Sequence, residues 1–239
     1  FLAEDENQPI NFSVPTGNFG DVYAGYLAKK LGLPINKLIV ATNQNDILHR
    51  AISKGKYEAE HVSETISPSM DIQIASNFER LIYDLNNHDS SQTLDDMKTI
   101  KQNGKYSIDD EKLKKINQDF LSARMSEQET LDVIKNIYEK FNMVLDPHTA
   151  IGYGAFDKHD LKGNNIVLAT AHPCKFPDAI LKAINLKSDL PNELKFILDE
   201  KENYGIIENN LKEVKQYILG KITWKLKKEI KFQIRNFII

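Results

Sequence analysis

A glycine-containing turn near the start of this sequence is the segment best suited to bind an anion. The turn T-G-N-F-G-D, residues Thr16–Asp21, stands between a short apolar run and a stretch with helical spacing. Glycines let backbone N–H groups point at a ligand without a Cβ in the way, and a helix N-terminus adds about half a positive charge. The turn therefore predicts an anion site, most naturally for a phosphate group.

The spacing of the two glycines does not by itself decide between a ligand site and a structural turn. Gly17 and Gly20 match neither the G-x-G-x-x-G pattern of dinucleotide sites nor a P-loop. Glycine turns also join strands to helices simply because the packing there is tight. From spacing alone, phosphate binding and tight packing are equal alternatives.

Two further polar groups follow apolar runs. Thr170 ends the run Ile166–Thr170, and the cluster Thr42–Asp46 ends another. Ligands of open parallel sheets lie beyond the carboxyl ends of the strands, where a threonine hydroxyl can pair with a ring nitrogen. Threonine is also a common strand residue, and Asn or Asp at such an end more often caps the next helix. Taken alone, both groups favour the structural interpretation.

The histidines and the single cysteine give little support to metal binding or to nucleophilic catalysis. The six histidines show no H-x-x-x-H pair and no accompanying carboxylate cluster, so no metal site is indicated. His172 stands close to Cys174, the single cysteine, but no third group is evident to orient the pair. We interpret these two residues as a loop histidine and a small buried thiol.

Composition narrows the class of protein. The 239 residues are 41% hydrophobic and 27% charged, as in an ordinary globular chain with one large domain or two smaller ones. The formal net charge of -3 does not indicate a nucleic-acid partner. The single cysteine fits a reducing cytoplasm, and no apolar run approaches the roughly 20 residues that span a membrane.

The elements that must position these residues alternate between strands and helices. We expect a strand at Ile10–Pro15, a helix at Asp21–Leu31 and a strand at Leu38–Thr42. This order is a β-α-β unit, which implies parallel strands and a right-handed crossover. Further helices are expected at Ile72–Leu85 and from Asp178 onwards.

The middle of the chain changes character. Residues 86–145 are charged and helix-patterned with little strand signal, and we interpret them as a helical insertion that includes the capping box Ser126–Glu129. The α/β pattern returns in residues 146–222, with a strand at Ile166–Thr170. Residues 223–239 form an atypical basic tail for which we have no functional account.

Three segments together resemble threonine synthases of the longer bacterial and fungal type. The segments are VPTGNFGDVYAGYLAKKLGLPINKLIVATNQNDILHR, SPSMDIQIASNFERLIYDL and LATAHPCKFPDAI. The resemblance runs from about Phe12 to about Ile222. It implies the tryptophan-synthase-β-like fold (fold type II), an α/β parallel-sheet domain that is incomplete in this chain.

The resemblance also implies a cofactor, a reaction and a set of site residues. Members of the family use pyridoxal 5'-phosphate to convert O-phospho-L-homoserine and water to L-threonine and phosphate, the last step of threonine biosynthesis. Thr170 is expected at the pyridine nitrogen of the cofactor, and residues 1–85 form the part that binds its phosphate. The residues implied to hold that phosphate are Gly17, Asn18, Phe19, Gly20 and Asp21.

The Schiff-base lysine of the family is not found in this sequence. It belongs to an F-K-D segment upstream of the phosphate loop, and no such segment occurs between Phe1 and Ile239. The segment that grips the substrate carboxylate is also expected upstream, and Lys29 and Lys175 have no claim to the lysine's role. We therefore expect the chain to be the C-terminal portion of a longer enzyme and to be inactive alone.

Two alternatives stay open. One is another enzyme of the same cofactor fold, such as a threonine dehydratase or a cysteine synthase, although those carry a more glycine-rich phosphate loop. The other is a non-catalytic module that binds phosphate or pyridoxal phosphate, which a gene complete at Phe1 would favour. The oligomeric state is not indicated.

Overall fold

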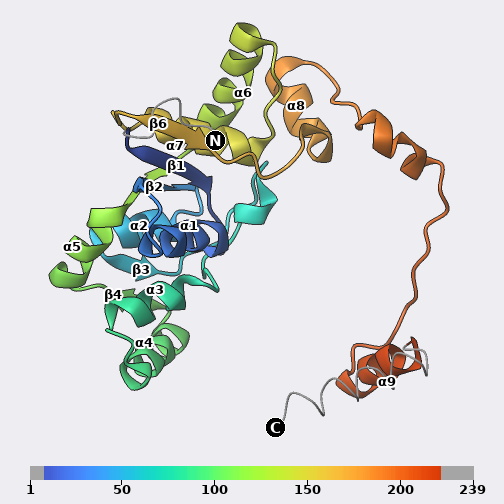
Figure 1. The fold of residues 1–239 in the computed structure, drawn as a ribbon. Coiled ribbons are helices and arrows are strands. Elements are labelled where there is room, and N and C mark those ends of the chain that lie inside the picture. Colours follow the sequence, from blue (N-terminus) through green and yellow to red (C-terminus); the bar gives the residue numbers. More distant parts are fainter. Residues whose placement is uncertain (1–7, 222–239) are drawn as a thin grey trace. The chain divides into compact units, whose positions relative to one another are not determined.

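A four-stranded parallel sheet, in the order β5-β2-β1-β6, carries the loops of interest (Figure 1). The structure is a computed structural model that describes residues 8–221. These residues fall into two compact units, of which the first ends at Asp189 and the second begins at Leu190. The sheet belongs to the first unit, so the candidate site lies there.

The two central strands confirm the predicted β-α-β unit. β1 (Ile10–Pro15) and β2 (Ile35–Thr42) pair in parallel, and α1 (Gly20–Lys30) connects them. β6 (Asn164–Val167) pairs with the other side of β1, and β5 (Phe120–Arg124) pairs with the other side of β2. Because all these pairings are parallel, the carboxyl ends of the four strands lie along one edge of the sheet.

Alternate side chains of β2 point to opposite faces of the sheet, where each set packs against helices. Leu38 and Val40 of β2 belong to the larger core cluster, which includes residues of α1 and α3. Ile39 and Ala41 belong to a second cluster with residues of α7 (Pro147–Asp157). This alternation explains the continuous apolar run from Leu38 to Ala41, which is typical of a strand covered by helices on both sides.

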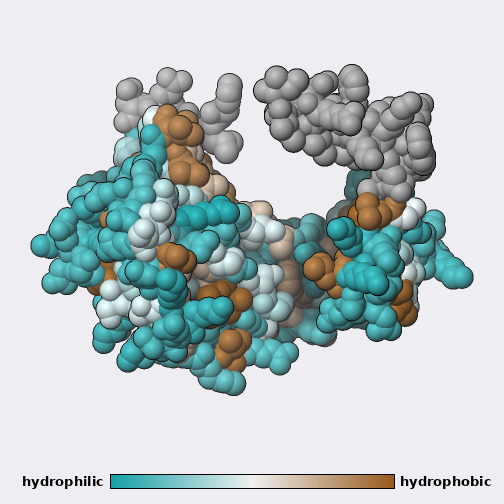
Figure 2. Space-filling model, turned by 90° about the horizontal axis from the view of Figure 1, so that it is seen from below, coloured by the Kyte–Doolittle hydropathy of each residue, from teal (hydrophilic) through white to brown (hydrophobic). Residues whose placement is uncertain are grey.

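The other elements complete the two units. None of the helices within residues 8–221 is long and apolar enough to cross a membrane. The face shown in Figure 2 is mainly hydrophilic, with hydrophobic residues in separate groups. The remaining elements are α2 (Ile47–Lys54), β3 (Lys56–Glu58), η1 (Pro68–Met70), α3 (Phe78–Leu85), α4 (Ser90–Asn103), β4 (Lys105–Ser107), α5 (Asp110–Asp119), α6 (Glu127–Phe141), η2 (Pro173–Lys175) and α8 (Pro177–Ile184), followed in the second unit by η3 (Asn192–Leu198) and α9 (Leu211–Lys221).

The helix predicted at Ile72–Leu85 begins only at Phe78. The backbone N–H of Ala75 donates to the Tyr57 hydroxyl at 2.8 Å, and the N–H of Asn77 donates to a carbonyl of the β1–α1 loop at 3.1 Å. These tertiary hydrogen bonds hold the residues before α3 in an irregular conformation. The apolar spacing did not predict this interruption.

The middle segment contains helices α4, α5 and α6, as expected, but it also contributes to the sheet. The expectation of little strand content is wrong at Phe120–Arg124, which is the edge strand β5. Phe120 is fully buried against the core, whereas a five-residue strand is too short to show a clear alternation in the sequence. The boundaries proposed at residues 85 and 145 stay predictions.

The late strand is shorter than expected. The strand predicted at Ile166–Thr170 ends at Val167, and the last hydrogen bond to β1 runs from Leu168 N to Ser13 O at 3.0 Å. Thr170 therefore lies in irregular chain beyond the strand. The helix expected from Asp178 is confirmed by α8, and residues 223–239 lie outside the described residues.

A half-buried carboxylate, that of Asp84, joins α1 to α3. Asp84 accepts hydrogen bonds from the Tyr26 hydroxyl at 2.8 Å and the Lys30 ammonium at 2.6 Å, and it contacts His88 Nε2 at 2.8 Å. Burial alone raises the pKa of Asp84, but the hydrogen bonds from its partners outweigh burial and hold that pKa below its ordinary value. These contacts of Asp84 fix the position of α1. Its first residue, Gly20, belongs to the predicted anion site.

The predicted capping box at the start of α6 is confirmed. The Ser126 hydroxyl accepts from Glu129 N at 3.3 Å, and Glu129 Oε2 accepts from Ser126 N at 2.7 Å. Glu129 Oε1 accepts from the Lys158 ammonium at 2.7 Å. The hydrogen bond from Lys158, followed by those from Ser126, lowers the pKa of Glu129 to about 2.

We predict that Glu129→Gln removes a part of the acid sensitivity of folding. Because the folded-state pKa lies below the ordinary 4.5, the carboxylate stabilises the fold above that pH and the contribution is lost as the pH falls toward 2. Glutamine keeps the box geometry but not the charge, so we expect a loss of about 1 kcal/mol near neutral pH and almost none near pH 2. Urea unfolding across this pH range measures the difference.

Glu139→Gln is the matched control on the same helix. Glu139 is 61% exposed and its partner Lys135 lies 3.9 Å away, so its removal is expected to change the free energy of unfolding by less than about 0.5 kcal/mol. Equal pH profiles for the two variants would contradict the role assigned to Glu129.

Candidate functional site

The loop between β1 and α1 forms a small cavity at the carboxyl edge of the sheet. The cavity has a volume of about 190 Å³ and is lined by residues Pro15–Asp21. All five residues predicted for the phosphate site, Gly17 to Asp21, therefore line one cavity. Thr16 anchors the loop to the neighbouring strand, because its N–H donates to Ala41 O at 2.8 Å.

Phe19 fixes the direction of this loop. Its backbone is left-handed, with φ 68° and ψ 5°, and its side chain is only 1% exposed. The ring packs edge-on against Phe78 at 5.2 Å between centroids and lies 5.8 Å from the ring of Phe120. The aromatic core therefore holds a backbone conformation that costs a non-glycine residue about 1–2 kcal/mol.

The segment of residues 67–77, here called the covering loop, packs against the β1–α1 loop. A Cβ on Gly17 would lie 2.6 Å from the carbonyl oxygen of Ser69, so no side chain fits there. The Asn18 carbonyl accepts from Asn77 N at 3.1 Å and Nδ2 at 3.0 Å, and its side-chain oxygen accepts from Ser76 Oγ at 3.2 Å. The glycine at position 17 is thus required by packing, independently of any ligand.

The same loop also leaves hydrogen-bond donors free. Phe19 occupies the N-cap position of α1, where it has no side-chain oxygen to cap the helix. Within residues 8–221, the backbone N–H groups of Gly17 through Asp21 have no hydrogen-bond acceptor. Consecutive free donors at the start of a helix are an arrangement that binds phosphate oxygens. The Asp21 carboxylate is exposed and adds no donor to the set.

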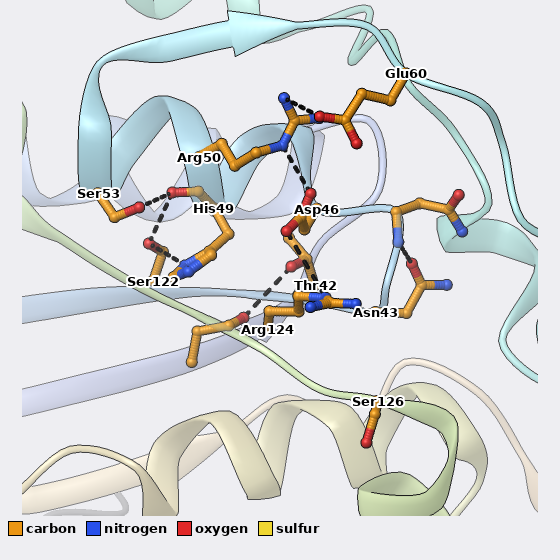
Figure 3. Close-up of polar contacts among 12 residues, drawn as sticks. Thr42, Asn43, Asp46, His49, Arg50, Ser53, Glu60, Ser122, Arg124 and Ser126 are labelled. Carbon is orange, nitrogen blue, oxygen red and sulfur yellow. Dashed lines mark hydrogen bonds and ion pairs between the residues drawn. The ribbon is translucent and has the colours of Figure 1, made fainter.

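The predicted polar cluster Thr42–Asp46 braces the covering loop rather than capping α2. Asp71 Oδ1 accepts from Asn43 Nδ2 at 2.7 Å and from Asn45 Nδ2 at 3.0 Å. Asp46 makes no capping hydrogen bond with α2 and pairs with Arg50 Nε at 2.8 Å instead (Figure 3). The cluster positions the segment that contains Ser69.

Thr170 lies at the same edge of the sheet as the loop. The paired residues Ser13 and Val167 precede Thr16 and Thr170 by the same number of residues. Thr170 is exposed, and its hydroxyl has no hydrogen-bond partner within the described part of the chain. The structure therefore places Thr170 beyond β6, on the sheet edge that also carries the β1–α1 loop.

His172 and Cys174 are neighbours, as expected from their spacing. His172 Nδ1 lies 2.9 Å from Cys174 Sγ, and the His172 side chain is exposed. Cys174 is half-buried rather than fully buried, because the short η2 helix carries it near the surface. No third side chain, within residues 8–221, hydrogen-bonds to this pair.

Sequence reasoning missed the residues that hold the loop from outside. Ser69 and Asn77 contact the β1–α1 loop, and Asp71 holds the segment that contains Ser69. Ser69 and Asp71 belong to the proline-containing segment S-P-S-M-D, which entered the prediction only through the family resemblance. Support of this kind depends on which loops meet in space, and that cannot be derived from spacing along the chain.

Comparison with known proteins identifies related sequences and structures. A family model described as "Threonine synthase, C-terminal" matches residues 149–218. The threonine synthase of Pseudomonas aeruginosa is 40% identical over 89% of this chain and 46% of its own length, and that of Saccharomyces cerevisiae is 42% identical over 85% and 45%. A crystal structure of threonine synthase from Brucella melitensis with bound pyridoxal phosphate superposes with a TM-score of 0.84, at 42% identity, over 90% of this chain and 47% of that one.

These matches give first a fold class and then a similarity to one family. The chain has the α/β fold of the fold type II pyridoxal-phosphate enzymes, which confirms the predicted fold class. Within that class its sequence and structure match the C-terminal portion of threonine synthases, as the sequence segments indicated. The chain spans about half the length of the curated relatives it matches.

We predict that Gly17→Ala destabilises the fold much more than Gly20→Ala. The added Cβ meets a backbone carbonyl at 2.6 Å at position 17, whereas at position 20 the nearest atom is a side-chain nitrogen at 3.4 Å. The steric conflict at Gly17 is expected to lower the free energy of unfolding by about 1–3 kcal/mol. Chemical denaturation measures both variants, and equal losses would contradict the close approach of the two loops.

Proposed function

We propose that this chain is part of a threonine synthase that converts O-phospho-L-homoserine and water to L-threonine and inorganic phosphate with pyridoxal 5'-phosphate as cofactor. The observation that carries the proposal is the row of free backbone donors at Gly17–Asp21, which occurs in a chain 40% identical to a threonine synthase. We also propose a cytoplasmic location and a small-molecule substrate, with no nucleic-acid or membrane partner.

The residues of the loop fit the phosphate group of this cofactor. The N–H groups of Gly17, Asn18, Phe19, Gly20 and Asp21 would hold it, supported by the positive end of α1. The cofactor supplies an electron sink when bound. Thr170 would pair with the ring nitrogen through a neutral hydroxyl, which holds a proton there less firmly than a carboxylate would.

We propose that the lysine that transfers protons in the reaction belongs to a segment outside this chain. Lys29 is already engaged, because its ammonium pairs with Asp119 at 2.6 Å and donates to Asn36 O at 2.8 Å. No lysine of the chain lies in an F-K-D segment. We therefore propose that the chain alone binds the cofactor phosphate but does not turn over substrate.

The cofactor part of the proposal is tested with pyridoxine 5'-phosphate, which has no aldehyde and cannot react with a stray lysine. We expect the chain to bind it at least about tenfold more tightly than pyridoxine, because several charge-assisted hydrogen bonds depend on the phosphate. Thr170→Val is expected to weaken both ligands by a similar factor, since it acts on the ring. Affinity is measured by isothermal titration calorimetry. Equal affinity for the two ligands would contradict the assignment of the loop as the phosphate site.

The reaction is tested with the full protein that contains this chain and with the chain alone. We expect the full protein to release phosphate from O-phospho-L-homoserine together with an equal amount of L-threonine, and the chain alone to release none. Consumption of L-threonine as a substrate would indicate the dehydratase alternative. Cofactor binding by the full protein without either reaction would indicate a non-catalytic module.

A further inference from the structure

A second pocket lies at the carboxyl end of β5 and shares no lining residue with the β1–α1 loop. It has a volume of about 460 Å³ and lies among β5, α2, the start of α6 and the end of α7. Every residue that lines it except Ala123 has a polar side chain. The side chains that matter here are His49, Ser122, Arg124, Glu129, Lys158 and His159.

The one carboxylate that lines this pocket is already satisfied. Glu129 Oε1 accepts from Lys158 at 2.7 Å, and Oε2 accepts from the backbone and side chain of Ser126, both at 2.7 Å. The Lys158 ammonium also donates to Arg124 O at 2.7 Å. The protein therefore offers the pocket neither a free carboxylate nor a fully free ammonium group.

The Arg124 guanidinium, in contrast, has donors without acceptors. Its nearest anionic partner is Asp46 Oδ2, 3.7 Å from Nε, which is beyond hydrogen-bond distance, and its side chain is 51% exposed. Arg50 in the same region is fully used: it donates to Asp46 at 2.8 Å and Glu58 O at 2.8 Å, and Figure 3 shows it pointing at Glu60 as well. Arg50 therefore has a structural role. The guanidinium of Arg124 has N–H groups that can donate to a ligand.

Two histidines add uncharged polar groups. His49 Nδ1 lies 3.0 Å from Ser122 Oγ, so when the hydroxyl donates to Nδ1 the imidazole proton is on Nε2 and can be donated to a ligand (Figure 3). His159 Nε2 is buried and has no hydrogen-bond partner within residues 8–221. Burial is the largest effect on both rings and lowers the pKa of each, which favours the neutral forms.

We propose that this pocket binds the oxyanion group of a small metabolite, a phosphate or a carboxylate, with Arg124 as its charged donor. A pocket whose one carboxylate is already paired and whose arginine has N–H groups without acceptors favours a ligand that offers acceptor oxygens. A guanidinium fork suits such oxygens because it donates to two of them at once. The position beyond the end of a parallel strand is where sheets of this type place their ligands.

The test follows the histidine ring signals of the full chain by NMR during titration with sodium phosphate, with sodium acetate and, at matched ionic strength, with sodium chloride. We expect phosphate, acetate or both to shift the signals of His49 and His159 in a saturable way, and chloride to leave them unchanged. The more effective anion identifies the source of the oxyanion. Signals of these rings that move with none of the three salts, or equally with chloride, overturn the proposal.

Two arginine variants separate binding from a general charge effect. Arg124→Gln is expected to weaken the apparent affinity by at least about tenfold, which is the effect of losing one charge-assisted hydrogen bond. Arg80→Gln removes the same charge from α3, beside Tyr23, and is expected to leave the affinity unchanged. Equal affinities of the two variants contradict the role of Arg124, and if Arg124→Gln does not fold, the titration of the unmodified chain decides alone.

Discussion

The whole candidate site depends on one constraint: Phe19 must bury its ring while its backbone stays left-handed. The ring belongs to the aromatic core with Phe78 and Phe120, and the backbone turn leads directly into α1. Burial of an aromatic side chain contributes about 1.5–3 kcal/mol, enough to offset the cost of that conformation. Because Phe19 carries no oxygen that could cap α1, the N–H groups at the start of the helix stay free. The packing of the core and the free N–H groups of the loop thus depend on one residue.

Around this residue, hydrogen bonds and close contacts from neighbouring segments support the loop. Asn77 and Ser69 press the covering loop against the turn, and Asp71 holds the covering loop to the end of β2 through Asn43. The end of β2 is itself paired between β1 and β5. Preorganised donors lose little entropy when a ligand binds, because neighbouring segments already fix their directions. This explains how a short loop can hold its backbone donors in defined directions.

The sequence predicted the local parts of this structure and missed the parts made by contacts between distant segments. The β-α-β unit and the capping box of α6 were predicted because apolar runs, glycines and Ser126–Glu129 act over a few residues. The edge strand Phe120–Arg124 was missed because it is short, and with it the pocket of Arg124. The irregular start before Phe78 was missed because its cause is hydrogen bonding to another loop. For the site, the residues Gly17–Asp21 were predicted and their supports were not.

The position of β1 between β2 and β6 has a consequence for the order of folding. β1 meets β2 after a short connection, whereas the bond from Asn11 to Asn165 closes a stretch of 154 residues. Loop-closure entropy makes the long pairing the slower one, so the turn at Gly17 can be assembled while the strand that leads to Thr170 is still unpaired. During synthesis from the N-terminus, the β1–α1 loop and its pairing partner β2 would therefore be in place before β6 joins the sheet.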